Sequence, residues 1–534
     1  MKSFVKERKK LFLSIIFGGL LSVLAIVNLY VSNTGVVKIL KGSKMETLKV
    51  GYPKSWGSLI PTQQNTVYAD SILSNVYEPL VDMKTSGSIA PLAAESWRIN
   101  EDFTRFEFFI DKNRRFSDGT FLKPIHFKNT WEQALREKDI NSANNNLVDL
   151  LSRIKGYKSF SVNGGLNGVV ATEISLTLHF SVPFRVALEH LTGARFAPYL
   201  AVEGKTIGTG AYTVVKNDGQ EAVLEANPYS AKKTHFQNVI VSVVDNPEKA
   251  MAKDKIDVYA FYRKPVTECI QKYSDLNMSC YTGHEAYHSV VAINGVRDSI
   301  FVDPALRLAM QYLLNVEYFN SDSYNKLNNE EKYAIKIDSQ SYLPMQQGRL
   351  EDSQSKKLVE EGFNYLKRLV DVSKSRPIRF YYNSDSALDK SIHDFLVRYG
   401  LIFSQDSGPL GFKERLSLLY KSYDLDMATI ALSIFNSDPD GLYHSLGREG
   451  AILMPVQSRP YIQDLLEQGR NITDRNSIKN HYERVQEQLL KDVPYVHLGF
   501  IMKNTLYRID KVEPDQEYMG SRIREYFHTY LPKD

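Results

Sequence analysis

Ile89-Ala90-Pro91-Leu92-Ala93-Ala94-Glu95-Ser96-Trp97 is the longest of seven short phrases that follow one another along this chain of 534 residues. The other six are Tyr77–Leu80, Arg115–Thr120, Ile207–Tyr212, Leu224–Tyr229, Phe301–Arg307 and Leu489–Val496. Each phrase alone is weak because such short combinations occur by chance, and none is a catalytic motif. Their order and spacing along most of the chain are the informative feature.

In this order the seven phrases resemble the family 5 extracellular solute-binding proteins, the oligopeptide- and dipeptide-binding receptors of ABC importers. The resemblance covers roughly residues 46 to 510. It implies a bilobal α/β fold of the periplasmic-binding-protein type, with discontinuous lobes, an extra subdomain and no catalytic residue, cofactor or metal. We expect lobe I at 46–75, 203–282 and 500–534, its extension subdomain at 76–202, lobe II at 283–499, and a hinge near 282 and 498.

Composition limits the class of protein further. Hydrophobic residues make up 43% and charged residues 24%, values of a globular chain that is long enough for two or three domains. The formal charge of +4 resides entirely in residues 1–32, so the remaining chain is neutral overall. A neutral body provides no basic field for nucleic acid, and we expect no nucleic-acid partner.

The N-terminal sequence has the features of a membrane-targeting segment. Residues 1–10 are basic, and Leu11–Val31 are 21 residues without a charge, enough for a helix of about 30 Å. No small-residue cleavage site follows the run, so we predict an uncleaved, single-pass anchor at 11–31 in the inner (cytoplasmic) membrane and a linker at 32–45. The body would lie on the periplasmic or extracellular side. A cleaved signal peptide is the alternative.

The pattern of apolar residues predicts strands and helices without a regular repeat, which fits a mixed α/β protein. Alternation predicts strands at 48–52, 103–110, 173–180, 239–244, 289–293 and 378–382, and a buried strand begins near 424. Helical spacing predicts helices at 124–136, 304–314, 358–370, 461–470 and 476–491. Asp303 is the expected N-cap of the second helix, with Pro304 at its first position.

One motif competes with a binding function. His284-Glu285-Ala286-Tyr287-His288 matches the zincin pattern H-E-x-x-H, which needs a helix to bring both imidazoles to one metal. The following Ser289–Ile293 is β-rich, and in a strand the two histidines would stand about 13 Å apart. We therefore interpret this segment as a strand entering the hinge and keep the zinc hydrolase as a rival.

The glycine-rich stretches are interpreted as turns. Ile207-Gly208-Thr209-Gly210 has neither the third glycine nor the Lys-Ser/Thr of a phosphate loop. Asn163-Gly164-Gly165-Leu166-Asn167-Gly168 is expected to be a surface turn for the same reason.

The segment from Asp424 to His444 is the expected ligand region. In the peptide-binding relatives, an Asp about three residues before the Asp-Pro turn holds the ligand's ammonium group, and Phe435 stands at that place here. This difference puts recognition of a free peptide N-terminus in doubt. Phe435 would instead stack on an apolar or sugar-like ligand or fill a core, and Asp438 and Asp440 are expected to cap and shape the turn. The candidate ligand-binding residues are Trp56, Asn294, Tyr381, Tyr382, Ser433, Phe435, Asn436 and Asp438.

Cys269 and Cys280 are the two cysteines. An exported protein permits a disulfide between them, and two buried thiols are the alternative.

The function expected from these features is capture of a peptide-like or other small solute by a membrane-anchored monomer that delivers it to ABC transporter permease subunits. Two rivals remain: an anchored sensory or structural derivative of the same fold that does not support import, and the zinc hydrolase of His284, Glu285 and His288.

Overall fold

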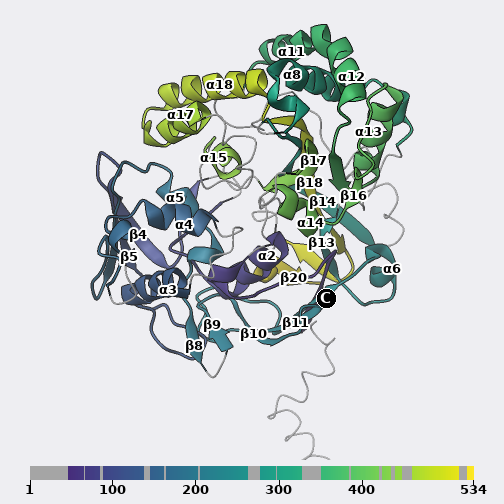
Figure 1. The fold of residues 1–534 in the computed structure, drawn as a ribbon. Coiled ribbons are helices and arrows are strands. Elements are labelled where there is room, and N and C mark those ends of the chain that lie inside the picture. Colours follow the sequence, from purple (N-terminus) through teal and green to yellow (C-terminus); the bar gives the residue numbers. More distant parts are fainter. Residues whose placement is uncertain are drawn as a thin grey trace, which may run out of the picture.

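The fold is that of a computed structural model (Figure 1). It describes residues 46–533 except 65, 85–87, 138–144, 161–163, 203–204, 263–276, 296–297, 328–349, 384–385, 420–423, 434–438, 448–459 and 516–525. Within these ranges, no helix combines the length and the apolar character needed to cross a bilayer. The anchor predicted at 11–31 lies outside them.

A sheet of ten strands connects two parts of the molecule, called the base and the head below. Its order is β10-β11-β12-β1-β13-β18-β14-β17-β15-β16. The bounds are β10 Tyr212–Asn217, β11 Glu221–Ala226, β12 Asn238–Val243, β1 Thr47–Tyr52, β13 Val258–Tyr262, β18 Tyr495–Arg508, β14 Met278–Ile293, β17 Met427–Ser433, β15 Phe380–Asn383 and β16 Gly408–Leu410. The strands predicted at 48–52, 239–244, 289–293 and 378–382 all belong to this sheet, although the third is the end of a much longer strand.

Two long antiparallel strands, β14 and β18, connect the halves of this sheet. The first residues of β14 pair with the end of β18, which pairs on its other side with β13. The last residues of β14 pair with β17. Between these parts the register shifts at Thr282/Glu285, Glu285/Tyr287 and Ser289/Val290. Such bulges bend a strand and increase its twist, and they mark where the chain passes from one half to the other.

The described residues form three bodies, which are defined by their hydrophobic cores. The base comprises the elements around the core of Leu48–Tyr77, Ala194–Ala260 and Val512–Tyr530, including α2 (Val67–Val76), β19 (Val512–Pro514) and β20 (Tyr530–Pro532). The insert comprises the elements around the core of Leu80–Phe196, and the head those around the two cores of Val290–Leu498. A small separate cluster lies under α6 (Pro247–Ala252).

The described residues of the insert form a four-stranded antiparallel sheet, in the order β4-β5-β7-β6, and helices that pack beside it. Its elements are β4 Ala94–Ile99, β5 Arg105–Ile110, β6 Val169–Ala171, β7 Ser175–His179, α3 Pro124–Glu137, α4 Asn145–Ser152 and α5 Ala187–His190. As the alternation predicts, Phe106, Phe108 and Ile110 of β5 are buried. The strand expected from residue 173 begins only at Ser175, so Ile174 is 66% exposed and does not face the core.

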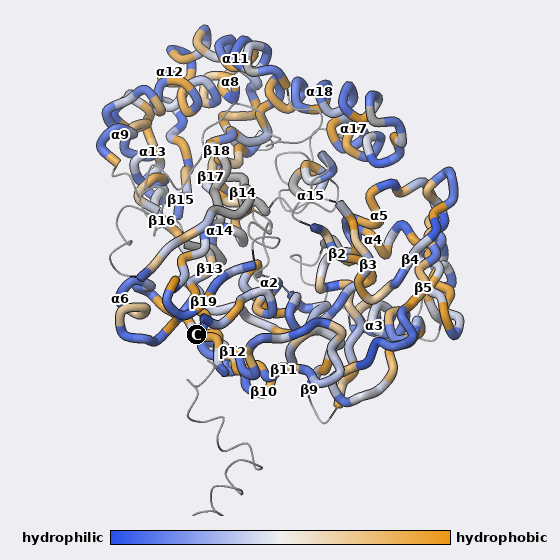
Figure 2. Tube along the Cα trace, turned by 180° about the vertical axis from the view of Figure 1, so that it is seen from behind, coloured by the Kyte–Doolittle hydropathy of each residue, from blue (hydrophilic) through white to orange (hydrophobic). Residues whose placement is uncertain are grey.

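The head carries most of the helices. They are α8 Pro304–Tyr312, α9 Asp322–Asn325, α11 Asp352–Glu360, α12 Leu366–Ser375, α13 Ala387–Arg398, α14 Phe412–Ser417, α15 Gly441–Leu446, α17 Pro460–Asn471 and α18 Arg475–Asp492. Along the outer helices in Figure 2, hydrophilic and hydrophobic residues alternate, as expected of helices that bury one face. Asp303 caps α8, since its carboxylate accepts a hydrogen bond from the backbone N–H of Ala305.

The prediction of a single helix at 358–370 is wrong. A 3₁₀ segment, Glu361–Tyr365, separates α11 from α12. Gly362 lies against α8 so closely that a Cβ atom there would stand 2.0 Å from the carbonyl oxygen of Leu308. The break therefore belongs to the contact between two segments, which the hydrophobic spacing of one of them does not record.

Candidate functional site

The passage between base and head coincides with the H-E-x-x-H motif. Residues 284–288 lie within the strand β14, as the β-rich context predicts, and not on a helix. This backbone is incompatible with the zincin arrangement, which requires helical spacing. Among the described residues, no group of three or more His, Cys, Asp or Glu side chains is arranged to hold a metal ion.

The end of β17, which belongs to the expected ligand region Asp424–His444, lies at the same place. Ser433 is the last residue of β17 and pairs with Tyr287 of β14, beside the register shifts. Phe435, Asn436 and Asp438 lie outside the described residues, as does the side chain of Ser433.

The four remaining candidate residues lie inside single bodies. Trp56 is fully buried in the base, where its Nε1–H donates to Oδ1 of Asn217 at 3.0 Å. Asn294 is fully buried in the head, and its Nδ2 donates to the carbonyl oxygen of Leu425 at 2.8 Å. These contacts give both side chains a packing role.

Tyr381 and Tyr382 point to the two different cores of the head, as neighbours on a strand do. Burial raises the pKa of both tyrosines. The ring of Tyr382 lies 5.2 Å from the ring of His393. Both tyrosines are therefore core residues of the head.

The glycines at 208 and 210 serve close packing. A Cβ atom at Gly208 would lie 2.1 Å from the carbonyl oxygen of Val76, and one at Gly210 would lie 2.6 Å from that of Asn75. The N–H of Gly210 donates to the carbonyl oxygen of Val76 at 2.9 Å. The predicted turn is thus confirmed, and its glycines dock the chain on the end of α2. The Asn163–Gly168 stretch is described only from Gly164 onward.

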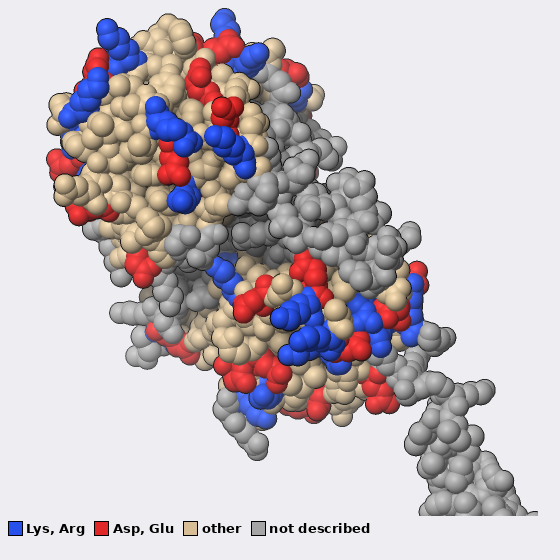
Figure 3. Space-filling model, turned by 90° about the vertical axis from the view of Figure 1, so that its right-hand side faces the viewer, with Lys and Arg blue, Asp and Glu red and all other residues tan. Residues whose placement is uncertain are grey.

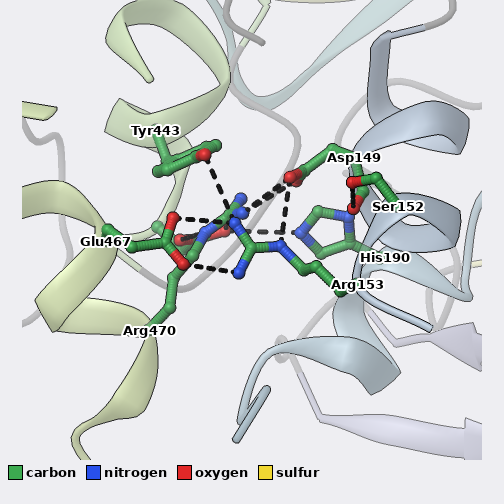
Figure 4. Close-up of polar contacts among 8 residues, drawn as sticks. Asp149, Ser152, Arg153, His190, Tyr443, Glu467 and Arg470 are labelled. Carbon is green, nitrogen blue, oxygen red and sulfur yellow. Dashed lines mark hydrogen bonds and ion pairs between the residues drawn. The ribbon is translucent and has the colours of Figure 1, made fainter. Parts of the chain in front are cut away.

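A buried ionic cluster joins the insert to the head (Figure 4). Asp149, Arg153 and His190 come from the insert, and Asp440, Tyr443, Glu467 and Arg470 come from the head. The guanidinium group of Arg470 is completely buried and binds two carboxylates. Its Nη1 lies 2.8 Å from Oδ2 of Asp149, across the interface, and its Nε lies 2.6 Å from Oδ1 of Asp440.

A second arginine makes the reciprocal contact. Arg153 follows α4 of the insert, and its Nη1 and Nη2 donate to the two carboxylate oxygens of Glu467 in the head at 2.6 and 2.8 Å. Its Nε donates to Asp149 within the insert at 3.2 Å. Each body therefore contributes an arginine that is bound by a carboxylate of the other body. Paired, planar bonds of this kind are the stronger class of charged hydrogen bond.

Aromatic rings and backbone atoms complete the contact. The guanidinium carbon of Arg470 lies 3.3 Å from the ring centre of Tyr443 and 5.3 Å from that of Phe184 in the insert. The N–H of Arg185 donates to the carbonyl oxygen of Arg470 at 3.3 Å. His190 reaches Asp440 from the insert, with 3.4 Å between Nε2 and Oδ2.

The cluster keeps its arginines charged. Burial by itself would lower the pKa of Arg470, but the carboxylates of Asp149 and Asp440 raise it above the ordinary value. For Glu467, burial opposes ionisation, and the hydrogen bonds from Arg153 outweigh it, so its pKa lies below the ordinary value. Burial raises the pKa of Tyr443. Charges as deeply buried as these persist only because they are paired.

Sequence reasoning missed this cluster. Asp440 was expected to cap the turn, but its side chain makes no capping hydrogen bond to α15 and binds Arg470 instead. Asp149 and Arg153 stand four residues apart, which on a helix also describes an ordinary exposed ion pair. The available signal was the apolar context of Asp149, between Leu147 and Leu150.

Cys280 is part of a disulfide bond. Its side chain is buried in the small cluster under α6. Cys269 lies outside the described residues.

The surface shows no concentration of one charge on the face seen in Figure 3, where basic and acidic side chains are interspersed. This agrees with the neutral body expected from composition.

Three solved structures show which class this fold defines. Haemophilus influenzae OppA in complex with RPPGFSPFR has a TM-score of 0.73 and 16% sequence identity, covering 92% of this chain and 99% of that one. The Escherichia coli murein tripeptide binding protein MppA has a TM-score of 0.75 at 16% identity and the same coverage. NikA from Brucella suis in complex with Fe(III)-EDTA has a TM-score of 0.69 at 17% identity, covering 91% of this chain and 100% of that one. The fold is that of the periplasmic binding proteins.

The sequence itself identifies the family. Residues 88–451 match the bacterial extracellular solute-binding proteins, family 5 middle. No curated protein sequence matches the chain. The chain belongs to the family 5 solute-binding proteins, as the seven phrases predicted.

Membership defines the general role. Proteins of this family bind peptides or other small ligands outside the cytoplasm, work with ABC permeases and are not enzymes.

Proposed function

We propose that this protein is a membrane-anchored receptor that encloses a peptide-like or other small solute between two lobes and presents it to an ABC importer. The observation that carries the proposal is the continuous ten-stranded sheet, in which two long strands connect base and head through a bulged crossing. Two bodies joined by a pair of crossing strands are able to close like a hinge on a ligand between them.

Lobe I in this proposal comprises 46–75, the extension 76–202, 203–282 and 500–534, and lobe II comprises 283–499. The bulges at 282–290 support a hinge there, because irregular pairing concentrates bending in a few residues. A disulfide between Cys269 and Cys280 would close a small loop in lobe I close to this hinge. The receptor acts as a monomer.

Within the ligand region Asp424–His444, the residues proposed to contact the solute are Ser433, Phe435, Asn436 and Asp438. The position of the end of β17 supports this proposal, because Ser433 pairs with Tyr287 next to the bulges of β14. Phe435 in place of an acidic residue favours a solute recognised through an apolar or ring surface over a peptide that depends on a free ammonium group. Aromatic walls with a few polar anchors are typical of such sites.

Thermal-shift measurements of the full-length chain with pools of peptides, sugars and metal chelates test this proposal. A ligand that binds only the folded state raises the melting temperature in proportion to the logarithm of its concentration. We expect one pool to give such a rise, and the absence of a rise with every pool would contradict the proposal.

Two phenylalanine variants locate the site. Phe435→Ala should reduce the solute-dependent rise, because it removes the proposed stacking surface. Phe363→Ala is the matched control, since Phe363 is 60% exposed on the outside of the head. Equal effects of the two substitutions would exclude Phe435 from the site.

The anchor at 11–31 has its own test. An uncleaved anchor leaves the protein at full length in the membrane fraction after an alkaline carbonate wash, with its body accessible to protease from the outer side. Recovery of a shortened soluble protein would establish the cleaved signal peptide.

A further inference from the structure

The ionic cluster joins two different bodies of the molecule. Its members are divided between insert and head, and Arg470 bonds Asp149 across the boundary while Arg153 bonds Glu467 in the opposite direction. The insert lies in the first half of the chain and joins the base, whereas the head joins the base through β14 and β18. Any hinge motion of the head away from the base and insert must therefore break these bonds.

Because the charged side chains of the cluster are buried, their pairing strongly affects whether insert and head stay together. Arg470 and Asp440 have side-chain exposures of 0%, and Asp149 has 4%. Water screens such pairs little, unlike an exposed surface pair. If Arg470 were lost, the contact would bury the carboxylates of Asp149 and Asp440 with only Arg153 and His190 beside them, which is unfavourable, whereas an opened molecule would hydrate them.

We propose that Asp149, Arg153, Glu467 and Arg470 form a clasp that holds head and insert together and so sets solute affinity without touching the solute. The inference rests on the proposed function, because the clasp acts through lobe closure. These four are positioning residues: each stabilises the closed arrangement relative to the open one. A solute that binds the closed arrangement gains or loses affinity in proportion to the population of that arrangement.

Two aromatic rings of the cluster have a role in the clasp. Tyr443 and Phe184 lie against the arginines from head and insert respectively, and rings at these distances attract a guanidinium group. They limit the arginines to the orientation that meets the opposing carboxylates. The clasp thus forms when the two bodies meet in one register, and a misaligned closure would leave its charges unpaired.

Distance measurement between spin labels on the full-length chain, with no solute added, tests the clasp. Lys158→Cys in the insert and Lys479→Cys in the head are suitable label sites, because both lysines are exposed. No free cysteine occurs among the described residues, so the labels attach at the introduced positions. We expect the parent chain to give a dominant short distance.

Arg470→Met should increase the ratio of long to short distances by about tenfold or more, because Asp149 and Asp440 lose their shared partner. Arg114→Met is the matched control: Arg114 pairs with the buried Glu78 at 2.8 Å, and neither residue belongs to the insert–head contact. It should leave the distances unchanged.

Glu467→Lys is the second variant, and it decides the question if Arg470→Met does not fold. Glu467 is 34% exposed, so the new charge is tolerated in the head while it opposes Arg153 of the insert. Glu487→Lys makes the same charge change at an exposed position on α18, where Glu487 pairs with Lys491. We expect opening with Glu467→Lys and none with Glu487→Lys.

Unchanged distances in folded Arg470→Met and Glu467→Lys would overturn the clasp. That result would leave the receptor function intact if the parent chain still binds a solute. Opened variants in a protein that binds no solute would establish the clasp and contradict the proposed function, so the two failures are distinguishable.

Discussion

Among single residues, Arg470 connects the most distant parts of the chain, because its guanidinium group is buried between carboxylates of the insert and the head. Arg470 binds Asp149, which is 321 positions away, and nothing in a local pattern indicates such a partner. Trp56 and Asn294 stand next to predicted strands, a place shared by core residues and cleft residues alike. The structure gives both of them partners within a single body.

His528 provides a prediction on acid stability. Burial, with Lys232 and His235 adding to it, lowers the pKa of His528 to about 3 from an ordinary 6.5. In the unfolded chain, His528 therefore binds a proton below pH 6.5. In the folded protein, the same side chain binds it only near pH 3. Stability from this group is complete above pH 6.5 and is lost as the pH falls below it.

Chemical denaturation at pH 7.5 and pH 5.5 measures this effect. We expect the parent chain to lose about 1.4 kcal/mol more than His528→Gln over this interval, since one pKa unit corresponds to that free energy. His179→Gln is the comparison variant: burial, with Arg105 and Lys155 adding to it, also lowers the pKa of His179, but this side chain is far less buried, so we expect a smaller difference from the parent chain. Parallel pH profiles for the parent and His528→Gln would show that folding does not lower the pKa of His528.

At the scale of elements, periodicity was a reliable guide where one face of an element meets one core. The strand β5 and the helices α3, α17 and α18 have nearly the predicted bounds for this reason. The prediction failed where two elements meet closely, as at Gly362, and where a strand extends beyond its apolar part, as in β14. Local spacing contains no information about a neighbour from a distant part of the chain.

Gly208→Ala tests the close contact between the Ile207–Tyr212 turn and α2. The added methyl group would collide with the backbone at Val76, which has little freedom to move because it ends a buried helix. We expect a loss of about 1–3 kcal/mol in unfolding free energy, measured by chemical denaturation.

Gly193→Ala is the matched control for this substitution. The nearest atom to a Cβ there is 3.5 Å away, an ordinary contact, and we expect a change well below about 1 kcal/mol. If both variants were equally stable, the glycine at 208 would have no packing role.

At the scale of the whole molecule, the resemblance predicted more than the residue patterns alone. Alternation identifies single strands, but it does not give the order of ten strands drawn from both ends of the chain. The seven phrases identified the family, and the discontinuous lobes with crossings near 282 and 498 stay a prediction. The register shifts of β14 and β18 occur at these places.

Native mass spectrometry of the full-length protein, after incubation with the solute pool that raises its melting temperature, shows whether the chain captures a solute without altering it. We predict one bound solute molecule per chain, recovered chemically unchanged when it is released. A chain that retains no solute from any pool, or that releases an altered molecule, would contradict the account of this protein as a solute-binding receptor.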